Sequence, residues 1–115
     1  DPSYIDNKEI YEEWKKSMED MEKHYMKMKE LGATTDMSRL ILPHSTAAEV
    51  TMTADIREWK HILSLRTTNK AHPAIRQLLI PLLKYFQKEM PEIFESVEYD
   101  KEFDEKYYAE LRIVE

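Results

Sequence analysis

Basic side chains gather in one short stretch of a chain that is acidic overall. The stretch REWKHILSLRT contains, in order, Arg57, Glu58, Lys60, His61 and Arg66. The 115 residues together carry a formal net charge of -6. The planar fork of an arginine suits bidentate, charge-assisted bonds to a phosphate group. The stretch therefore favours a small phosphate-bearing anion as ligand, and structural salt bridges or a solvated basic surface are the alternative.

The distribution of charge restricts the kind of partner. Residues 56–88 hold seven Lys or Arg and one acidic residue, whereas residues 89–115 hold ten acidic and three basic residues. We expect residues 98–115 to form an acidic tail, either solvated or presented to another chain. The net negative charge argues against a nucleic-acid polymer as partner, because domains that bind one usually carry a net basic surface.

Composition excludes several kinds of chemistry. The chain has no cysteine, which excludes a disulfide, a thiolate metal site and a cysteine nucleophile. Its four histidines are not paired at the spacing of metal ligands, so we expect no metal, and a single glycine excludes a glycine-rich phosphate loop. No apolar run is long enough to cross a membrane, and the first residues lack the order of a signal peptide. We therefore expect a soluble, cytoplasmic protein without membrane contact.

A long amphipathic helix is predicted near the start of the chain. Its apolar residues recur at intervals of three and four and form one stripe, which consists of Ile10, Trp14, Met18, Met21, Tyr25 and Met28. Asp6, with Glu9 three residues later, predicts the start of this helix, and Gly32 predicts a left-handed end. A short second helix should follow, capped by Thr34 or Thr35.

The middle of the chain predicts a strand that leads directly into a helix. Apolar and polar residues alternate from 48 to 54, which is the period of a strand with one buried face. The apolar members are Ala48, Val50, Met52 and Ala54. Asp55 should end the strand and cap the next helix, whose apolar side carries Trp59, Ile62 and Leu63.

A further helix is predicted from Pro73 to Glu89, with a broad apolar face and an interruption at Pro81, which removes one backbone hydrogen bond. Residues 107–114 alternate weakly and are a possible strand. The predicted fold class is α+β and predominantly helical, and residues 1–115 are expected to form a single domain.

The helix after Asp55 cannot bring all the basic residues to one group. If it is regular, Arg57 and His61 share a face, whereas Arg66 is nine residues from Arg57 and lies about 180° around the helix. Two ligands, or two parts of a composite site, are therefore the more natural interpretation.

A resemblance becomes specific when these motifs are taken together. The run SRLILP at residues 38–43, the alternating segment, and DIREWKHILSLRTTNKAHPAIRQ at residues 55–77 resemble the C-terminal half of flavin-dependent thymidylate synthases. The resemblance covers about residues 10–97 and is strongest over 39–77. It implies that the chain is part of a larger α+β fold.

The resemblance also implies an activity, that of a methyltransferase in nucleotide biosynthesis. Members of this family convert dUMP to dTMP with methylenetetrahydrofolate as carbon donor, FAD as hydride carrier and NADPH as reductant. They work as homotetramers with active sites between subunits, and they need no cysteine on the uracil ring. A chain without cysteine is compatible with this route.

The matching positions imply roles for six residues. Arg39 resembles the arginine that contacts the dUMP phosphate, and Arg66 resembles the catalytic arginine that binds the uracil ring. The positions that resemble FAD contacts are Asp55, Arg57, His61 and Leu65. Asp55 stands where the family commonly has asparagine, so an amide that can donate is replaced by a carboxylate that only accepts.

One family signature is absent. No Arg-His-Arg motif occurs in the sequence. We therefore expect a fragment or a degenerate homologue of such an enzyme, inactive by itself. The alternatives are a non-catalytic helical interaction module, a flavin-less homologue, or an unrelated binder of small anions.

Overall fold

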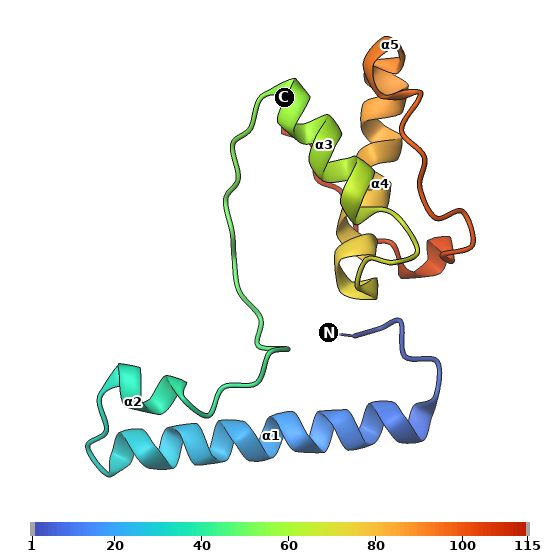
Figure 1. The fold of residues 1–115 in the computed structure, drawn as a ribbon. Coiled ribbons are helices and arrows are strands. Elements are labelled where there is room, and N and C mark those ends of the chain that lie inside the picture. Colours follow the sequence, from blue (N-terminus) through green and yellow to red (C-terminus); the bar gives the residue numbers. More distant parts are fainter. Residues whose placement is uncertain (1, 115) are drawn as a thin grey trace. The chain divides into compact units, whose positions relative to one another are not determined.

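The computed structural model describes residues 2–114, and this part of the chain is predominantly helical, as the sequence predicts. In chain order the elements are α1 (Lys8–Glu30), α2 (Thr35–Arg39), α3 (Ile56–Arg66), α4 (Pro73–Glu89), α5 (Pro91–Phe94) and a 3-10 helix at Glu105–Tyr107 (Figure 1). The chain divides into two compact units, Asp1–Val50 and Thr51–Glu115, and each is described by itself.

The strand predicted for residues 48–54 is not seen. These residues have no regular secondary structure, and the described part of the chain contains no strand. The apolar members of the pattern are exposed, with Val50 at 80% and Met52 at 54%. A strand is held by backbone hydrogen bonds to a neighbour, and the alternating pattern does not supply that neighbour. The α+β part of the predicted fold class is therefore unconfirmed.

The possible strand at residues 107–114 is not seen either. Its first residue belongs to the 3-10 helix, and residues 108–114 have no regular secondary structure. The reason is the same, because no second strand lies beside this segment within residues 2–114.

The start of α1 differs from the prediction by one residue. The side chain of Asn7, and not that of Asp6, accepts hydrogen bonds from the amides of Glu9 and Ile10, at 2.9 and 3.2 Å. Asparagine and aspartate are about equally good at this position, so neighbouring residues of these two types leave the sequence ambiguous.

The end of α1 is the predicted one. Gly32 has a φ angle of 89°, in the left-handed region. Its amide donates to the carbonyl of Lys29, and the amide of Ala33 donates to the carbonyl of Met28, both at 3.0 Å. These two bonds satisfy carbonyl groups that the end of a helix leaves without partners. The short helix α2 follows at once, capped by the hydroxyl of Thr34 as predicted.

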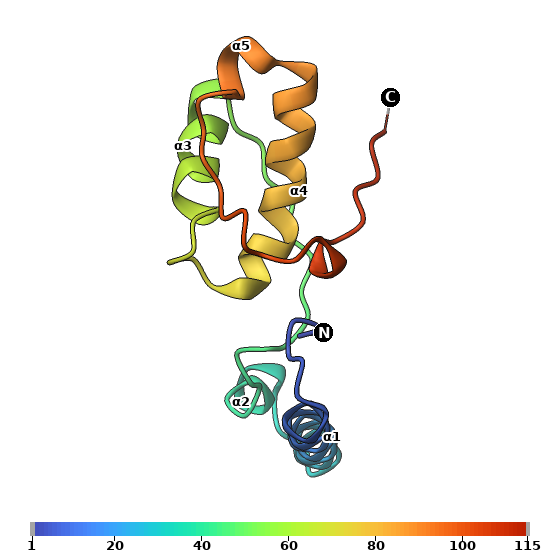
Figure 2. The same cartoon turned by 90° about the vertical axis from the view of Figure 1, so that its right-hand side faces the viewer.

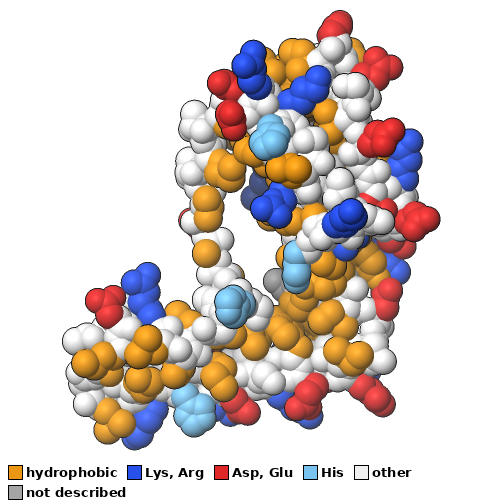
Figure 3. Space-filling model, viewed as in Figure 1, with side chains coloured by type: hydrophobic (Ala, Val, Ile, Leu, Met, Phe, Trp, Pro, Cys, Tyr) orange, Lys and Arg blue, Asp and Glu red, His pale blue; other side chains and the backbone are white. Residues whose placement is uncertain are grey.

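The apolar stripe of α1 is only partly covered within its unit. α1 contains no buried residue, and Ile10 is 58% exposed. Some cover comes from the residues that follow α2, where the indole of Trp14 donates to the hydroxyl of Ser45 at 3.3 Å. Hydrophobic side chains are visible at the surface over α1 and α2 (Figure 3).

The second unit is built on a small core between α3, α4 and α5. Leu63, Leu83 and Phe94 have no exposed surface. Partly buried side chains surround them: Trp59, Leu79, Phe86, Met90, Ile93 and Tyr99. Complete burial of one large apolar side chain stabilises a fold by about 1.5–3 kcal/mol. The predicted apolar side of α3 is thus the side that faces the core.

After α5 the chain turns back alongside α4 (Figure 2). The side-chain amide of Gln87 donates to the carbonyls of Phe94 and Val97, at 3.2 and 2.9 Å. Further on, the amide of Asp100 donates to the carbonyl of Thr67 at 2.8 Å. We call residues 95–104 the return segment, because they run from the end of α4 towards its start.

Pro81 explains where the chain after the return segment attaches. A proline has no amide hydrogen, so the carbonyl of Gln77, four residues earlier, lacks its usual helical donor. The amide of Ala109 donates to this carbonyl at 2.9 Å, and the side chain of Gln77 donates to the carbonyl of Tyr107 at 3.0 Å. The interruption in α4 is therefore an attachment point for the C-terminal residues.

A nearly buried ion pair fixes the return segment to α4. Arg76 donates to Asp100 at 2.7 Å, and their side chains are only 14% and 9% exposed. The guanidinium also lies 5.0 Å from the ring centre of Phe103. Since an unpaired charge in a buried position is costly, each member of the pair depends on the other.

Removal of Asp100 tests this dependence. We expect Asp100→Ala to lower the free energy of unfolding by about 3 kcal/mol, because Arg76 then keeps its charge without a partner. Glu102→Ala, two residues away and exposed, is the matched control and should change stability by less than about 0.5 kcal/mol. Urea unfolding followed by circular dichroism measures both, and equal effects of the two substitutions would contradict the role of the pair.

Candidate functional site

A surface hollow of about 560 Å³ lies beside α3. The helix contributes four residues to it, at positions that share one helix face: Arg57, Lys60, His61 and Ser64. The other wall consists of Thr68 and of Ser96, Val97 and Glu98 in the return segment. Basic side chains gather over α3 on the face shown in Figure 3. The hollow thus has a basic side on α3 and a carboxylate on the facing wall.

The two cofactor residues predicted on this side do meet. Arg57 and His61 both line the hollow, and neither side chain makes a hydrogen bond or ion pair within residues 2–114. They are exposed and four residues apart, so they lie on the same face of α3. Unpaired donors at the edge of a hollow are available to an anionic ligand.

Leu65 and Arg66 lie outside the hollow. α3 is a regular helix through Arg66. Arg66 therefore lies about 180° around the helix from Arg57, on the opposite face. Leu65 lies about 80° from Arg57, between the two, and is 54% exposed. Around the helix the order is therefore a basic face, an exposed leucine and a single arginine.

Asp55 has a structural role in the fold. Its carboxylate accepts a hydrogen bond from the amide of Glu58 at 2.8 Å and caps α3. This confirms the predicted cap. A flavin contact of Asp55 stays a prediction, and a ligand would compete with the cap for the carboxylate.

Arg39 lies in the other unit. It is the last residue of α2, and its side chain is 65% exposed and 3.6 Å from the carboxylate of Asp36. Such an exposed pair contributes at most about 1 kcal/mol, so it does not prevent a contact between the arginine and a ligand.

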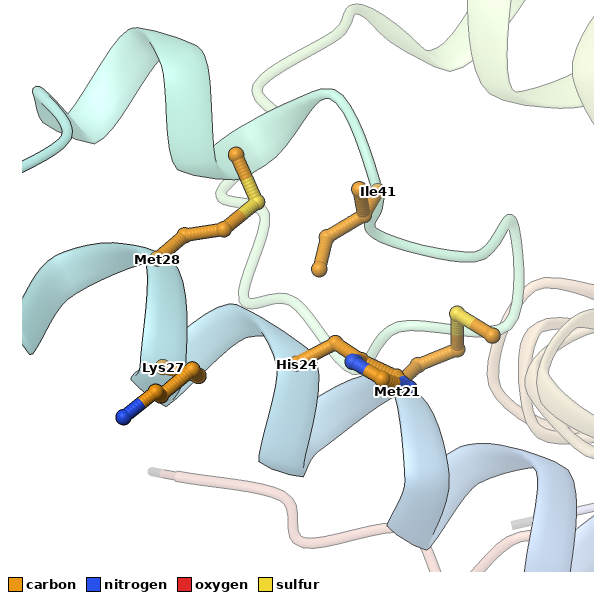
Figure 4. A pocket seen from close by; sticks show the side chains of 5 residues that line it. All are labelled: Met21, His24, Lys27, Met28 and Ile41. Atoms are coloured by element: carbon orange, nitrogen blue, oxygen red, sulfur yellow. The ribbon is translucent and has the colours of Figure 1, made fainter. Parts of the chain in front are cut away.

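A second, apolar pocket lies within the first unit (Figure 4). Its volume is about 330 Å³, and its lining consists of Met21, His24, Lys27, Met28 and Ile41. Ile41 belongs to the SRLILP run and the other four belong to α1, two of them on the predicted stripe. The pocket therefore shows which part of the stripe faces the residues after α2.

A cluster of ionisable groups lies away from the hollow. The amine of Lys84 donates to Glu105 at 2.7 Å and lies 5.4 Å from the ring centre of Tyr108. The hydrogen bond to Glu105 raises the pKa of Lys84, and burial raises the pKa of the Tyr108 hydroxyl. Both groups stay in their usual states at neutral pH, so the cluster attaches the C-terminal residues rather than providing reactive groups.

Some residues around the site were not predicted from the sequence. Thr67, next to the lining residue Thr68, is fully buried, and its hydroxyl donates to the carbonyl of Leu63 at 2.7 Å. The sequence contains no local pattern that predicts the wall at residues 96–98, because contacts between residues distant in sequence bring this segment to α3. No group of three His, Asp or Glu residues within residues 2–114 is arranged to hold a metal ion, and no helix there is long and apolar enough to cross a membrane.

Comparison with known proteins gives this geometry a context. A family model described as thymidylate synthase complementing protein matches residues 1–92. The chain belongs to the flavin-dependent thymidylate synthase family. The resemblance found in the motifs is thereby confirmed.

The similar curated proteins are longer than this chain. A flavin-dependent thymidylate synthase of Thermosipho melanesiensis is 36% identical over 80 residues, which are 70% of this chain and 35% of that protein. The enzyme of Pyrococcus abyssi is 32% identical over 82 residues, 71% of this chain and 34% of the relative. The chain therefore spans about a third of the length of these relatives. No solved structure matches it significantly.

The family position of Asp55 generates a test of its cap. Asp55→Ala should destabilise the second unit by about 1 kcal/mol, because the amide of Glu58 loses its acceptor. Asp55→Asn introduces the residue that the motif resemblance implies at this position and should be neutral within a few tenths of a kcal/mol, since its side-chain oxygen also accepts. Urea unfolding distinguishes the two, and an alanine variant as stable as the original chain would rule out the cap.

Proposed function

We propose that this chain supplies part of the FAD and dUMP sites of a flavin-dependent thymidylate synthase. The whole enzyme would convert dUMP to dTMP, with methylenetetrahydrofolate as carbon donor, reduced FAD as hydride donor and NADPH as reductant. The observation that carries the proposal is the order of residues around α3, from a basic hollow through an exposed leucine to a lone arginine. This order supports a site in which a flavin lies next to a nucleotide, because an anionic group, a flat apolar ring and a second ligand would each meet a different surface of α3.

The basic face would hold the flavin cofactor. Arg57 and His61 would bind its anionic part in the hollow, where their side chains have no partners among the described residues. Leu65 would pack against the flat ring, because it is exposed and lies beside the basic face. FAD supplies the hydride transfer, and these side chains bind and orient it. Asp55 would reach the cofactor only from its position as the cap of α3.

The other side of α3 would face the nucleotide. Arg66 is exposed and its side chain makes no hydrogen bond or ion pair within residues 2–114, so its guanidinium is available. Next to a uracil ring, its charge would stabilise the negative character that develops as C5 becomes nucleophilic. Arg39 would bind the phosphate of dUMP, for which its planar fork is well suited.

Assembly is part of the proposal. The stripe of α1 has no buried residue and is only partly covered within its unit, which supports contacts with further copies in a homotetramer like that of the family. Residues 48–54 would become a strand of a larger α+β fold once the remainder of the enzyme supplies a neighbour. Without that remainder and its Arg-His-Arg motif, we expect residues 1–115 to be inactive.

The exposed stripe also favours a second candidate function. A helical interaction module, or a homologue without flavin, would use the same apolar surface of α1 and leave the hollow empty of cofactor. The two candidates differ in colour, since a bound flavin absorbs visible light. Purified enzyme without flavin absorbance, and without a thermal shift on addition of dUMP, would favour the second candidate.

The most specific test changes Arg66 in the complete enzyme. Arg66→Ala should reduce the rate of dTMP formation by at least about a hundredfold, because the developing charge on the ring loses its partner. Flavin absorbance should remain, since Arg66 lies outside the hollow. Arg112→Ala, another exposed arginine, is the control and should keep full turnover. Normal turnover by the Arg66 variant would refute the assignment.

A further inference from the structure

Lys60 differs from the other half-buried cations of the second unit. Three basic side chains in residues 51–114 are half-buried, namely Lys60, Arg76 and Lys84. Arg76 donates to Asp100 and Lys84 donates to Glu105, each at 2.7 Å. The side chain of Lys60 makes no hydrogen bond or ion pair within residues 2–114. A basic group that is partly removed from water and has no partner calls for an explanation.

The aliphatic stem of Lys60 explains part of its burial. Lys60 lies about 60° around α3 from the buried Leu63, so its aliphatic stem can cover the core while the amine reaches water. That accounts for the burial of the stem. It does not account for the two cations Lys60 and Arg57 in one hollow, since neither side chain forms an ion pair with Glu98 on the facing wall. Two like charges that are three residues apart on a helix repel each other, and a bound anion would offset this repulsion.

Helix geometry brings Lys60 and Arg57 to adjacent places in the hollow. They are separated by about 4.5 Å along the axis of α3 and by about 60° around it. Both side chains are long, so two neighbouring phosphate groups can be bound at once, one by each cation. His61 lies about 40° from Arg57 on the side away from Lys60 and is a third donor in the hollow.

The facing wall limits what the rest of the ligand can be. Val97 is held there by the bond from Gln87 to its carbonyl, and Glu98 follows it. A carboxylate accepts hydrogen bonds from the hydroxyl groups of a ribose and repels a further phosphate group. Val97 and Glu98 lie beyond residues 1–92, the part that matches the family model. The basic side of the hollow therefore lies within the part that matches the model, and these two wall residues lie outside it.

We propose that Lys60 is a further binding residue of the hollow, which together with Arg57 holds the diphosphate of a nucleoside-diphosphate group. The inference rests on the proposed function, because FAD contains a diphosphate and is the ligand proposed for the same hollow. It adds a residue and a ligand moiety that the family resemblance did not assign. Lys60 binds the ligand and takes no part in the reaction.

Calorimetric titration of residues 1–115 tests the proposal with three probes. ADP and FAD contain a diphosphate, whereas riboflavin does not. Lys60→Met keeps the stem and removes the charge, so it should raise the Kd for ADP and for FAD about tenfold and leave riboflavin unchanged. Lys60→Arg should retain most of the affinity. Lys88→Met is the matched control on α4, exposed and outside the hollow, and should behave as the original chain.

Each outcome has a separate meaning. If Arg57→Gln weakens FAD binding and Lys60→Met does not, the role of Lys60 is refuted and the proposed flavin site stands. If ADP binding depends on Lys60 and FAD does not bind, the diphosphate site stands and the flavin assignment fails. Absence of ADP binding at millimolar concentration refutes the inference. An equal loss for riboflavin also refutes it, and circular dichroism of both Lys60 variants shows whether the fold is the cause.

Discussion

The packing of Leu63 between α4 and α5 is the constraint on which the rest of the second unit depends. Leu63 has no exposed surface and lies against Leu83 and Phe94, so the orientation of α3 about its own axis is fixed. Helical periodicity then decides the direction of every other side chain on α3. Arg57 faces the hollow and Arg66 faces away from it because Leu63 faces the core. The proposed division between a flavin side and a nucleotide side follows from this one contact.

The return segment completes what the core begins. It is attached at two places along α4, by Gln87 and by the pair of Arg76 with Asp100, and the chain after it is attached at the carbonyl that Pro81 leaves without a helical donor. Because these attachments hold residues 96–98 beside α3, the hollow has a second wall instead of being an open helix face. A segment that belongs to neither a helix nor a strand thus contributes directly to the shape of the candidate site.

How much the sequence predicted depended on the range of the interactions. The helices were predicted well because caps and apolar periodicity are local signals, and Asp55 and Gly32 lie where their chemistry requires. The strand at residues 48–54 failed because a strand depends on a partner elsewhere. Residues 96–98 were missed for the same reason, since Arg76 and Asp100 are 24 positions apart and nothing local announces their contact. The basic residues on α3 could be singled out from the sequence as candidates, and their roles stay predictions, whereas the wall that faces them could not be predicted.

The central claim is that α3 presents two ligand surfaces on opposite sides. The most direct test is backbone amide NMR of residues 1–115, titrated separately with FAD and with dUMP. The account predicts that FAD shifts the amides of residues 57–64 and 96–98, and that dUMP shifts those at the end of α3, near residue 66. Shifts of the same amides by both ligands, or no response of α3 to either, would contradict it.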